Sequence, residues 1–219
     1  MDNEKKKNMK KLVAQEDIAF IICEGNIKSE IDSPVKTKES SVKFKNKTDE
    51  NKVKLTNKQK LLLEGARLRL GDEYDASYYS EGHPPDGKSA CVDVVYYAYK
   101  KIGVNLQKKV NADLRSNPGI YPAKGDYAIN HRRCPNLIVW FRRFTKSLDR
   151  KSKGKSLSGW KPGDVVFWSL TNDGVADHCG IISDKKTDDG VPLAIHQFPP
   201  ECKEEDVLND WVIMGHFRW

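Results

Sequence analysis

One cysteine and two histidines have types and spacing that suit nucleophilic catalysis. Cys91 begins a segment with helical periodicity (89–103), and His178 and His196 each lie in a short β-branched segment farther along the chain. A helix N-terminus and a neighbouring imidazolium both stabilise a thiolate, which is the nucleophilic form of cysteine. The pattern predicts Cys91 as a nucleophile, His178 as its general base and His196 as the residue that orients the base.

The predicted helix must hold the thiol at the edge of its buried face. Val95, Tyr99 and Ile102 follow one another at helical spacing and form an apolar stripe. Cys91 lies one turn before Val95 on this stripe, at the start of the helix. We therefore expect the thiol to be partly covered and close to the helix N-terminus.

The two histidines are expected to share one face of a β-hairpin. A turn centred near residues 187–188 would pair their segments and set His178 opposite His196. Because side chains alternate between the two faces of a strand, direct opposition places both imidazoles on the same face. A slip of one residue would separate them.

Two other interpretations of these residues stay open. A cysteine on an apolar helical stripe can be an inert core residue. Cys91, His178 and His196 could also supply three ligands to a zinc ion, with water as the fourth. No CxxC or HxxxH pair supports a metal site, so we expect neither a metal nor another cofactor.

Three more residues are candidates for contact with a substrate. His131 and Arg132 lie in the polar run NHRRC, which could contact an anionic or peptide substrate. Arg132 and Arg133 could instead tie down a loop through ion pairs. Trp168 flanks a Pro-Gly-Asp turn together with Trp160, and it could line a groove.

The remaining cysteines are expected to be structural. The chain has five cysteines, an odd number without a CxxC pair, so a disulfide scaffold is not expected. Cys134, Cys179 and Cys202 are assigned to the interior, and Cys179 should point to the face opposite His178. His83 shows no pattern that would place it in a site.

The order of the predicted elements indicates an α+β fold. Helical segments come first, near residues 56–70, 89–103, 110–116 and 135–148. Short β-branched segments bounded by turn residues come later, at 163–170, 178–184, 193–198 and 212–219. Helices followed by strands favour an antiparallel sheet with helices on one side.

Residues 1–56 are predicted to form a disordered tail, and residues 57–219 a single folded domain. The first 60 residues contain 15 lysines and 10 acidic residues, so they carry +5 of the net charge of +7. Such a tail suits adhesion to an anionic surface, although a solvated lysine run is the simpler explanation. The apolar run 18–23 is too short for a membrane span. The stretch 9–23 is similar to a signal peptide interrupted by two acidic residues, so we expect a degenerate signal or none.

Several segments resemble motifs of the NlpC-type cell-wall peptidases, a papain-like cysteine peptidase superfamily. They are YSEGHPPDGKSAC (79–91), WKPGDVVFW (160–168), DHCGIISD (177–184) and AIHQ (194–197). More closely, CVDVVYYAY, YAINHRRCPNL and the terminal GHFRW resemble the bacterial YijF-like family within that superfamily. The resemblance extends from about Tyr74 to the C-terminus.

This resemblance implies an α+β, papain-like NlpC-type fold, with helices on a central antiparallel sheet and the nucleophile at a helix N-terminus. It implies that Cys91 is the nucleophile, that His178 is the base and that His196 orients it. Tyr79 would help the backbone N–H of Cys91 to bind the oxyanion. The implied reaction is metal-free hydrolysis of an amide bond, most often in peptidoglycan stem peptides, through an acyl-enzyme.

The motif around the nucleophile departs from the NlpC-type pattern. Enzymes of that type usually read Asp-Cys-Ser-Gly, whereas this chain reads ACVD (90–93) and lacks the glycine that allows close helix packing. Asn130 stands where the YijF-like pattern usually has an aspartate before His-Arg-Arg. The first departure bears on the substrate rather than on the fold or the nucleophile.

Functions other than wall hydrolysis stay open. The same fold could serve a secreted effector or toxin, an acyltransferase or deamidase, or a non-catalytic binding module. The expected partner is peptidoglycan or another peptide substrate, with an immunity or inhibitor protein in the toxin case. Nucleic acid is ranked last because it rests on the tail charge alone. A wall substrate predicts a periplasmic or secreted protein, and a cytoplasmic protein that awaits specialised export is the alternative.

Overall fold

The computed structural model describes residues 54–219 of the chain. The predicted tail lies almost wholly outside the described residues, as does the signal-like stretch. The first described helix, α2 (Asn57–Arg67), begins after Thr56, whose hydroxyl accepts a hydrogen bond from the Gln59 N–H. The Gln59 side chain accepts a hydrogen bond from the Thr56 N–H in return. This capping box fixes where the helix begins.

The four predicted helices precede the four predicted strands along the chain, and additional short strands occur. The helices after α2 are α3 (Cys91–Lys101), α4 (Leu106–Ser116) and α5 (Cys134–Phe144). The strands are β1 (Glu73–Tyr74), β2 (Lys88–Ser89), β3 (Lys146–Ser147), β4 (Val165–Ser169), β5 (His178–Lys186), β6 (Pro192–Phe198), β7 (Glu201–Glu205) and β8 (Val212–Arg218). Four of these strands were not predicted. Three of them, β1, β2 and β3, have two residues each, and the sequence ECKEE of β7 contains no β-branched residue.

The described strands form one curled sheet in the order β2-β1-β7-β6-β5-β4-β8-β3. The four predicted strands, β6, β5, β4 and β8, are neighbours in its centre and pair antiparallel. The short strands β1 and β2 pair parallel at one edge. The predicted α+β class with an antiparallel sheet is therefore confirmed, apart from this parallel edge.

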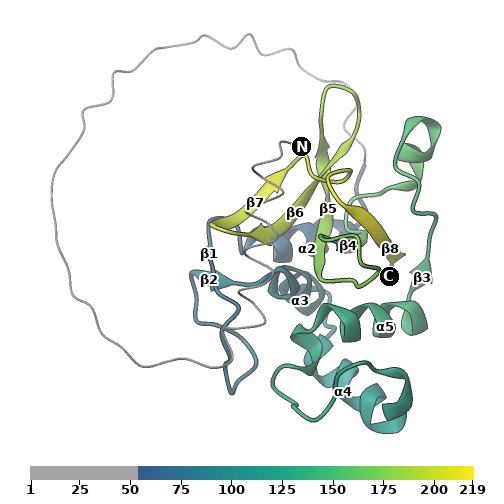
Figure 1. The fold of residues 1–219 in the computed structure, drawn as a ribbon. Coiled ribbons are helices and arrows are strands. Elements are labelled where there is room, and N and C mark those ends of the chain that lie inside the picture. Colours follow the sequence, from purple (N-terminus) through teal and green to yellow (C-terminus); the bar gives the residue numbers. More distant parts are fainter. Residues whose placement is uncertain (1–53) are drawn as a thin grey trace, which may run out of the picture.

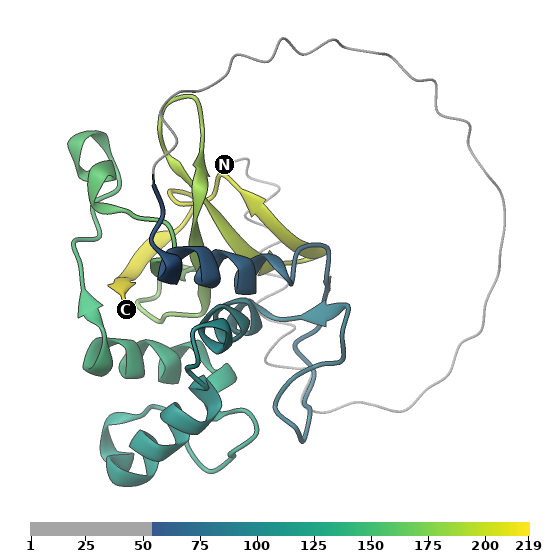
Figure 2. The same ribbon diagram turned by 180° about the vertical axis from the view of Figure 1, so that it is seen from behind.

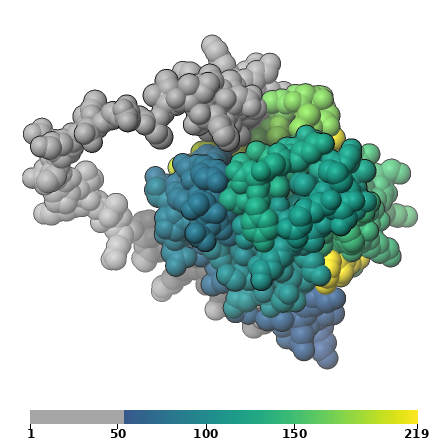
Figure 3. All heavy atoms as spheres, turned by 90° about the horizontal axis from the view of Figure 1, so that it is seen from below, coloured from purple at the N-terminus to yellow at the C-terminus, as the bar shows by residue number. Residues whose placement is uncertain are grey.

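The helices pack on one face of the sheet. In both ribbon views α3 and α5 lie between the sheet and α4 (Figures 1 and 2). Strand residues on that face share a core with α2, α3 and α5, among them Val165, Phe167, Ile181, Ile195 and Phe217. The other face carries a second, smaller apolar cluster that contains Val166, Trp168, Ile182 and Ala194. Seen from below, α4 and the adjoining teal segments form much of the molecular face (Figure 3).

The β5–β6 hairpin has a different register from the predicted one. Ile181 pairs with Ile195 and Ile182 with Ala194, and the ladder is irregular beyond Ile182. The turn lies later than predicted, since Thr187 donates to Val191 O and Gly190 (φ 83°) donates back to Thr187 O. The prediction that His178 and His196 lie directly opposite each other was therefore wrong. The observed register differs from the predicted one by two residues, so the two histidine side chains still lie on the same face of the sheet.

Candidate active site

Cys91 is the first residue of α3, and its side chain is partly exposed. The residue before it, Ala90, has an extended backbone and no side chain that could cap the helix. Asp93 instead holds the residue before the helix, because its Oδ2 accepts a hydrogen bond of 2.8 Å from the Ala90 N–H. The N–H groups of the first helical turn have no acceptor within the helix. The thiol thus lies at the positive end of the helix dipole.

His178 is the first residue of β5, and it lies close enough to Cys91 to lower the pKa of the thiol. Its neighbour Cys179 also contacts Cys91, although successive strand residues point to opposite faces. Cys91 can contact both because the N-terminus of α3 lies at the end of the strand. His178 Nε2 is already bonded to His196, so Nδ1 is the ring nitrogen that remains for the thiol.

The two histidines continue into a chain of hydrogen bonds that ends on a carboxylate. His178 Nε2 lies 2.8 Å from His196 Nδ1, and His196 Nε2 lies 3.1 Å from Glu205 Oε1. Burial lowers the pKa of His196, which keeps this ring neutral. A neutral His196 with its proton on Nε2 donates to Glu205 and accepts from His178 at Nδ1. In this arrangement His178 donates from Nε2 to His196, and its Nδ1 is left for Cys91.

Packing fixes the orientation of the two rings. The Trp168 ring stacks on His178 with centroids 5.5 Å apart, and the Trp168 Nε1–H donates to Leu208 O. Gly180 lies between the histidines on β5. A Cβ atom there would lie 3.0 Å from His196 Cβ and 3.3 Å from the Trp168 ring. The absence of a side chain at Gly180 therefore lets the tryptophan and both imidazoles approach one another.

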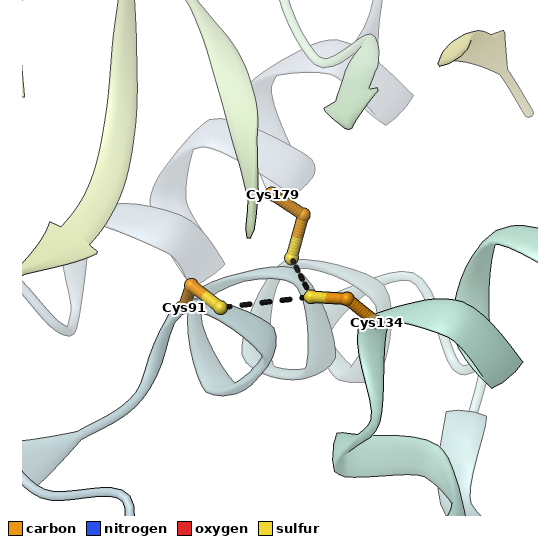
Figure 4. A group of neighbouring side chains, drawn as sticks. All are labelled: Cys91, Cys134 and Cys179. Carbon is orange, nitrogen blue, oxygen red and sulfur yellow. Dashed lines mark hydrogen bonds between the residues drawn. The ribbon is translucent and has the colours of Figure 1, made fainter. Parts of the chain in front are cut away.

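Three thiols meet at the start of α3. Cys91 Sγ lies 3.7 Å from Cys134 Sγ, which lies 3.8 Å from Cys179 Sγ (Figure 4). Cys134 and Cys179 are buried, as predicted, but they surround the candidate nucleophile instead of packing elsewhere in the core. As predicted from the alternation, Cys179 belongs to the helix-facing core cluster, whereas His178 stacks on Trp168 of the other cluster.

The thiol contacts and His178 act together on the ionisation of Cys91. The neighbouring thiols of Cys134 and Cys179 lower the pKa of Cys91 most, and the nearby His178 imidazole lowers it further. Burial acts in the opposite direction, but the pKa falls well below its usual range. For Cys179, burial and the two neighbouring thiols raise the pKa well above its usual range. The cluster therefore concentrates its negative charge on Cys91.

A zinc site made of Cys91, His178 and His196 does not form in residues 54–219. Among these described residues, the group whose ligand atoms lie close enough to share an ion consists of the three cysteines. His178 is not part of that group, and its Nε2 is held by His196.

Arg132 ties a loop to the start of α3. Its guanidinium donates to Ser77 O at 2.9 Å and to Asp75 O at 3.3 Å, and it pairs with Asp93 at 3.2 Å. Asp93 is fully buried and also lies 2.9 Å from His83 Nδ1. Arg132 of the NHRRC run therefore holds a loop in place through hydrogen bonds and an ion pair, as the second of the two interpretations predicted.

His131 and Trp168 are both interior side chains. His131 Nε2 lies 3.2 Å from His83 Nε2, and the His131 side chain is almost completely buried. Burial, together with the charges of His83 and Arg132, lowers the pKa of His131 to about 3. Trp168 is 0 % exposed, so it packs behind His178 and does not line a groove. Neither side chain is placed for contact with a substrate.

Tyr79 lies in the loop that Arg132 ties down. Its hydroxyl donates a hydrogen bond of 2.8 Å to Asp75 Oδ2, which also pairs with Lys88 at 3.2 Å. The predicted role of Tyr79 at the oxyanion stays a prediction.

The sequence reasoning missed Glu205, the Cys134 contact and the His83–Asp93 pair. Glu205 belongs to the unpredicted strand β7, where His196 pairs with Lys203, so Glu205 lies two residues along on the same face. The Cys134 contact had one usable signal. Cys134 precedes a proline that was predicted to begin a helix, so both Cys91 and Cys134 lie at helix starts.

The sequence comparisons establish the family of the chain. Residues 64–219 match the family described as "Domain of unknown function (DUF1287)". The chain therefore belongs to the DUF1287 family. It is also similar to the protein named "Uncharacterized protein YijF" of Escherichia coli strain K12. The two are 39% identical over 169 residues, which are 72% of this chain and 80% of the relative. The resemblance to YijF-like proteins is thus confirmed.

Solved structures with a similar arrangement include proteins of the NlpC/P60 family. NlpC1 from Trichomonas vaginalis gives a TM-score of 0.45 at 11% identity, covering 74% of this chain and 44% of that one. A lipoprotein-like NLP/P60 protein from Staphylococcus aureus gives 0.42 at 15%, covering 78% and 44%. An N-acetylmuramoyl-L-alanine amidase from Bacteroides uniformis gives 0.44 at 13%, covering 74% and 99%. The chain thus spans less than half the length of the first two proteins.

Each helix within residues 54–219 is too short or too polar to cross a membrane.

Proposed function

We propose that this protein is a cysteine hydrolase that cleaves an amide bond, with peptidoglycan stem peptides as its substrate class. The observation that carries the proposal is the hydrogen-bonded series His178–His196–Glu205 beside Cys91, whose pKa His178 lowers. A nucleophile, a base and a residue that orients the base are the parts that acyl transfer requires.

The first step forms an acyl-enzyme. The Cys91 thiolate attacks the carbonyl carbon of the scissile amide, and the carbonyl oxygen becomes an oxyanion. N–H groups at the start of α3, that of Cys91 among them, are the donors for this oxyanion. Each donor in such a site typically contributes about 3–4 kcal/mol to the transition state. His178 then gives its proton to the leaving amine, the C–N bond breaks, and a thioester on Cys91 remains.

The second step hydrolyses the thioester. Neutral His178 removes a proton from water, and the hydroxide attacks the thioester carbonyl carbon. The C–S bond breaks, the acid product leaves, and Cys91 and His178 return to the thiolate–imidazolium pair. During both steps His196 fixes the orientation of the His178 ring. Nδ1 of His196 accepts a hydrogen bond from His178 Nε2, and Nε2–H of His196 donates to Glu205.

The substrate class rests on the NlpC-type motifs of the sequence. The Pro-Gly-Asp strand (160–168) and the His-x-Gly-Ile strand (177–184) are the segments that carry this resemblance. Work on the cell wall would take place in the periplasm or outside the cell, with export by a specialised route as the alternative. An immunity or inhibitor protein would be the partner if the chain acts as a toxin.

Digestion of purified peptidoglycan tests the proposal. The full chain, a Cys91→Ala variant and a Cys202→Ala control are incubated with peptidoglycan, and released fragments are identified by mass spectrometry. Cys202 is a matched control because it is also a buried free cysteine but lies outside the three-thiol group. We expect new peptide fragments from the wild type and the control only. Fragments from Cys91→Ala, or a new ester, a new amide or released ammonia in place of cleaved peptide, would contradict it.

A further inference from the structure

Three cysteine side chains from separate elements converge on one point. Cys91 and Cys134 begin α3 and α5, and Cys179 is the second residue of β5. Figure 4 shows the three sulfur atoms turned toward one another. Two of the sulfur–sulfur distances are 3.7 and 3.8 Å, and all three sulfurs lie within 4.8 Å of one another.

These distances match the ligand spacing of a metal thiolate site. Zinc binds cysteine sulfur at about 2.3 Å in a tetrahedral arrangement, which separates neighbouring sulfur atoms by about 3.8 Å. We propose that Cys91, Cys134 and Cys179 form a site for a thiophilic divalent cation such as Zn²⁺. Three thiolates would occupy three positions of the tetrahedron, and water would occupy the fourth.

Helix position favours the thiolate form at two of the three cysteines. Two of them lie at the first residue of an eleven-residue helix, where the partial positive charge of the helix dipole stabilises thiolate. Each thiol that becomes a ligand gives up its proton to the solvent. Cys91 is partly exposed whereas the other two are buried, so the cation would enter past Cys91.

A purely structural role would not require this convergence. Buried free cysteines usually behave as small apolar residues that pack against carbon atoms. Cys202 is of this kind, since it is buried in the same core cluster but lies outside the three-thiol group. A single disulfide would engage two of the thiols and leave the third without a function.

A bound cation would occupy the sulfur of the proposed nucleophile. This consequence rests on the proposed function, in which Cys91 must be free to attack. Metal binding would then reversibly block the enzyme, and a chelator would restore it. The binding itself does not depend on catalysis, so it can be tested without a substrate.

Cadmium titration of the reduced full-length chain tests the site. Cd²⁺ is the probe because its thiolate bonds give an ultraviolet charge-transfer band, and competition with Zn²⁺ then gives the zinc affinity. All samples carry Cys23→Ser, which removes the cysteine outside the described residues. The test variants are Cys134→Val and Cys179→Val, and Cys202→Val is the matched control. Circular dichroism and thermal unfolding verify that each variant is folded.

We expect one Cd²⁺ per chain, with a band that disappears when Zn²⁺ competes. Each test variant should bind Cd²⁺ about 100-fold more weakly, which corresponds to about one quarter of the binding free energy of a four-ligand zinc site. The control should bind Cd²⁺ as tightly as the parent. Three results would overturn the proposal. The first is equal binding by the parent and both folded test variants. The second is no Cd²⁺ binding by the reduced parent, and the third is a Cys91–Cys134 disulfide that persists in reductant. If peptidoglycan digestion fails while Cd²⁺ binds, only the proposed function is lost.

Discussion

His178 Nε2 and His196 Nδ1 lie 2.8 Å apart, although the two residues are not opposite each other in the β5–β6 ladder. His196 lies across from Gly180, and the missing side chain there leaves space for the two rings to meet diagonally. The contact therefore depends on a residue that takes no part in the chemistry. It fixes which nitrogen of His178 faces Cys91, and several predictions rest on it.

Replacing Gly180 with alanine should displace His196. The new Cβ would lie 2.9 Å from Ile195 O and 3.0 Å from His196 Cβ, so the hairpin must shift. We expect a loss of about 1–3 kcal/mol in unfolding free energy, together with a loss of hydrolysis. Denaturant unfolding and peptidoglycan digestion measure the two effects. Gly119→Ala is the control, because a Cβ there meets no atom within 4 Å. Equal behaviour of the two variants would argue against the packing role of Gly180.

Removing the Glu205 carboxylate should weaken catalysis without abolishing it. Glu205 fixes the proton of His196 on Nε2 through one hydrogen bond, and the net value of such a bond is about 0.5–1.5 kcal/mol. Glu205→Ala should therefore lower kcat by about 2–10-fold. Glu205→Gln keeps an acceptor oxygen and should recover most of the rate. A Gln variant as slow as the Ala variant would show that the charge, rather than the hydrogen bond, is required.

Arg132 should matter for stability because its partner is a buried carboxylate. Removing one member of a buried ion pair typically costs about 3–5 kcal/mol, and Asp93 has no exposed surface. Arg132→Met should therefore lower the unfolding free energy by about this amount. Arg133→Met should cost about 1 kcal/mol or less, because within residues 54–219 its guanidinium donates a long hydrogen bond of 3.4 Å to Asn130 Oδ1. A stable Arg132→Met protein with weakened substrate binding would instead support the substrate-contact interpretation.

Stability should fall on mild acidification because of His131. The folded protein holds the pKa of His131 at about 3, whereas an unfolded histidine titrates near 6.5. Between these values the unfolded state binds a proton that the folded state does not. The contribution of neutral His131 is therefore present above about pH 6.5 and is lost by up to about 1.4 kcal/mol per pH unit below it.

Denaturant unfolding at several pH values between 7 and 4 measures this slope. A His131→Asn variant should show a slope shallower by up to that amount, whatever its stability at neutral pH. His196 is present in both proteins, so its own lowered pKa affects both slopes equally. Identical slopes would contradict the assignment of a neutral, buried His131.

The thiol neighbours should control the reactivity of Cys91. Because the contact with Cys134 is the largest influence that lowers the pKa of Cys91, Cys134→Val should raise that pKa and move the pH midpoint of alkylation upward. Cys202→Val lacks this contact and should leave the midpoint unchanged. An unchanged midpoint in Cys134→Val would mean that Cys134 does not lower the pKa of Cys91 and would leave His178 as the main influence on it.

Much of the arrangement follows from local sequence signals. The Thr56 cap, the apolar stripe behind Cys91 and the short β-branched strands gave the helix start, the thiol position and the central antiparallel strands. The same-face placement of His178 and His196 followed from strand alternation alone, because any even shift of register preserves it. These features depend on neighbours within a few residues along the chain.

The remaining features depend on contacts between distant segments. The hairpin register was set by a turn at Gly190 and by an irregular ladder beyond Ile182, neither of which has a periodic signal. Glu205 lies on a charged strand that pairs only because β6 is beside it. Cys134 is 43 residues from Cys91, and no spacing rule links the starts of two different helices.

The pH dependence of Cys91 alkylation by iodoacetamide tests the central claim most directly, since it needs no knowledge of the substrate. Wild type and His178→Ala are alkylated across a range of pH, and peptide mass spectrometry follows the modification of Cys91. We predict a midpoint for the wild type well below the usual thiol pKa of about 8.5 and a higher midpoint for His178→Ala. A wild-type midpoint at or above the usual value, unchanged by His178→Ala, would contradict an activated nucleophile at Cys91.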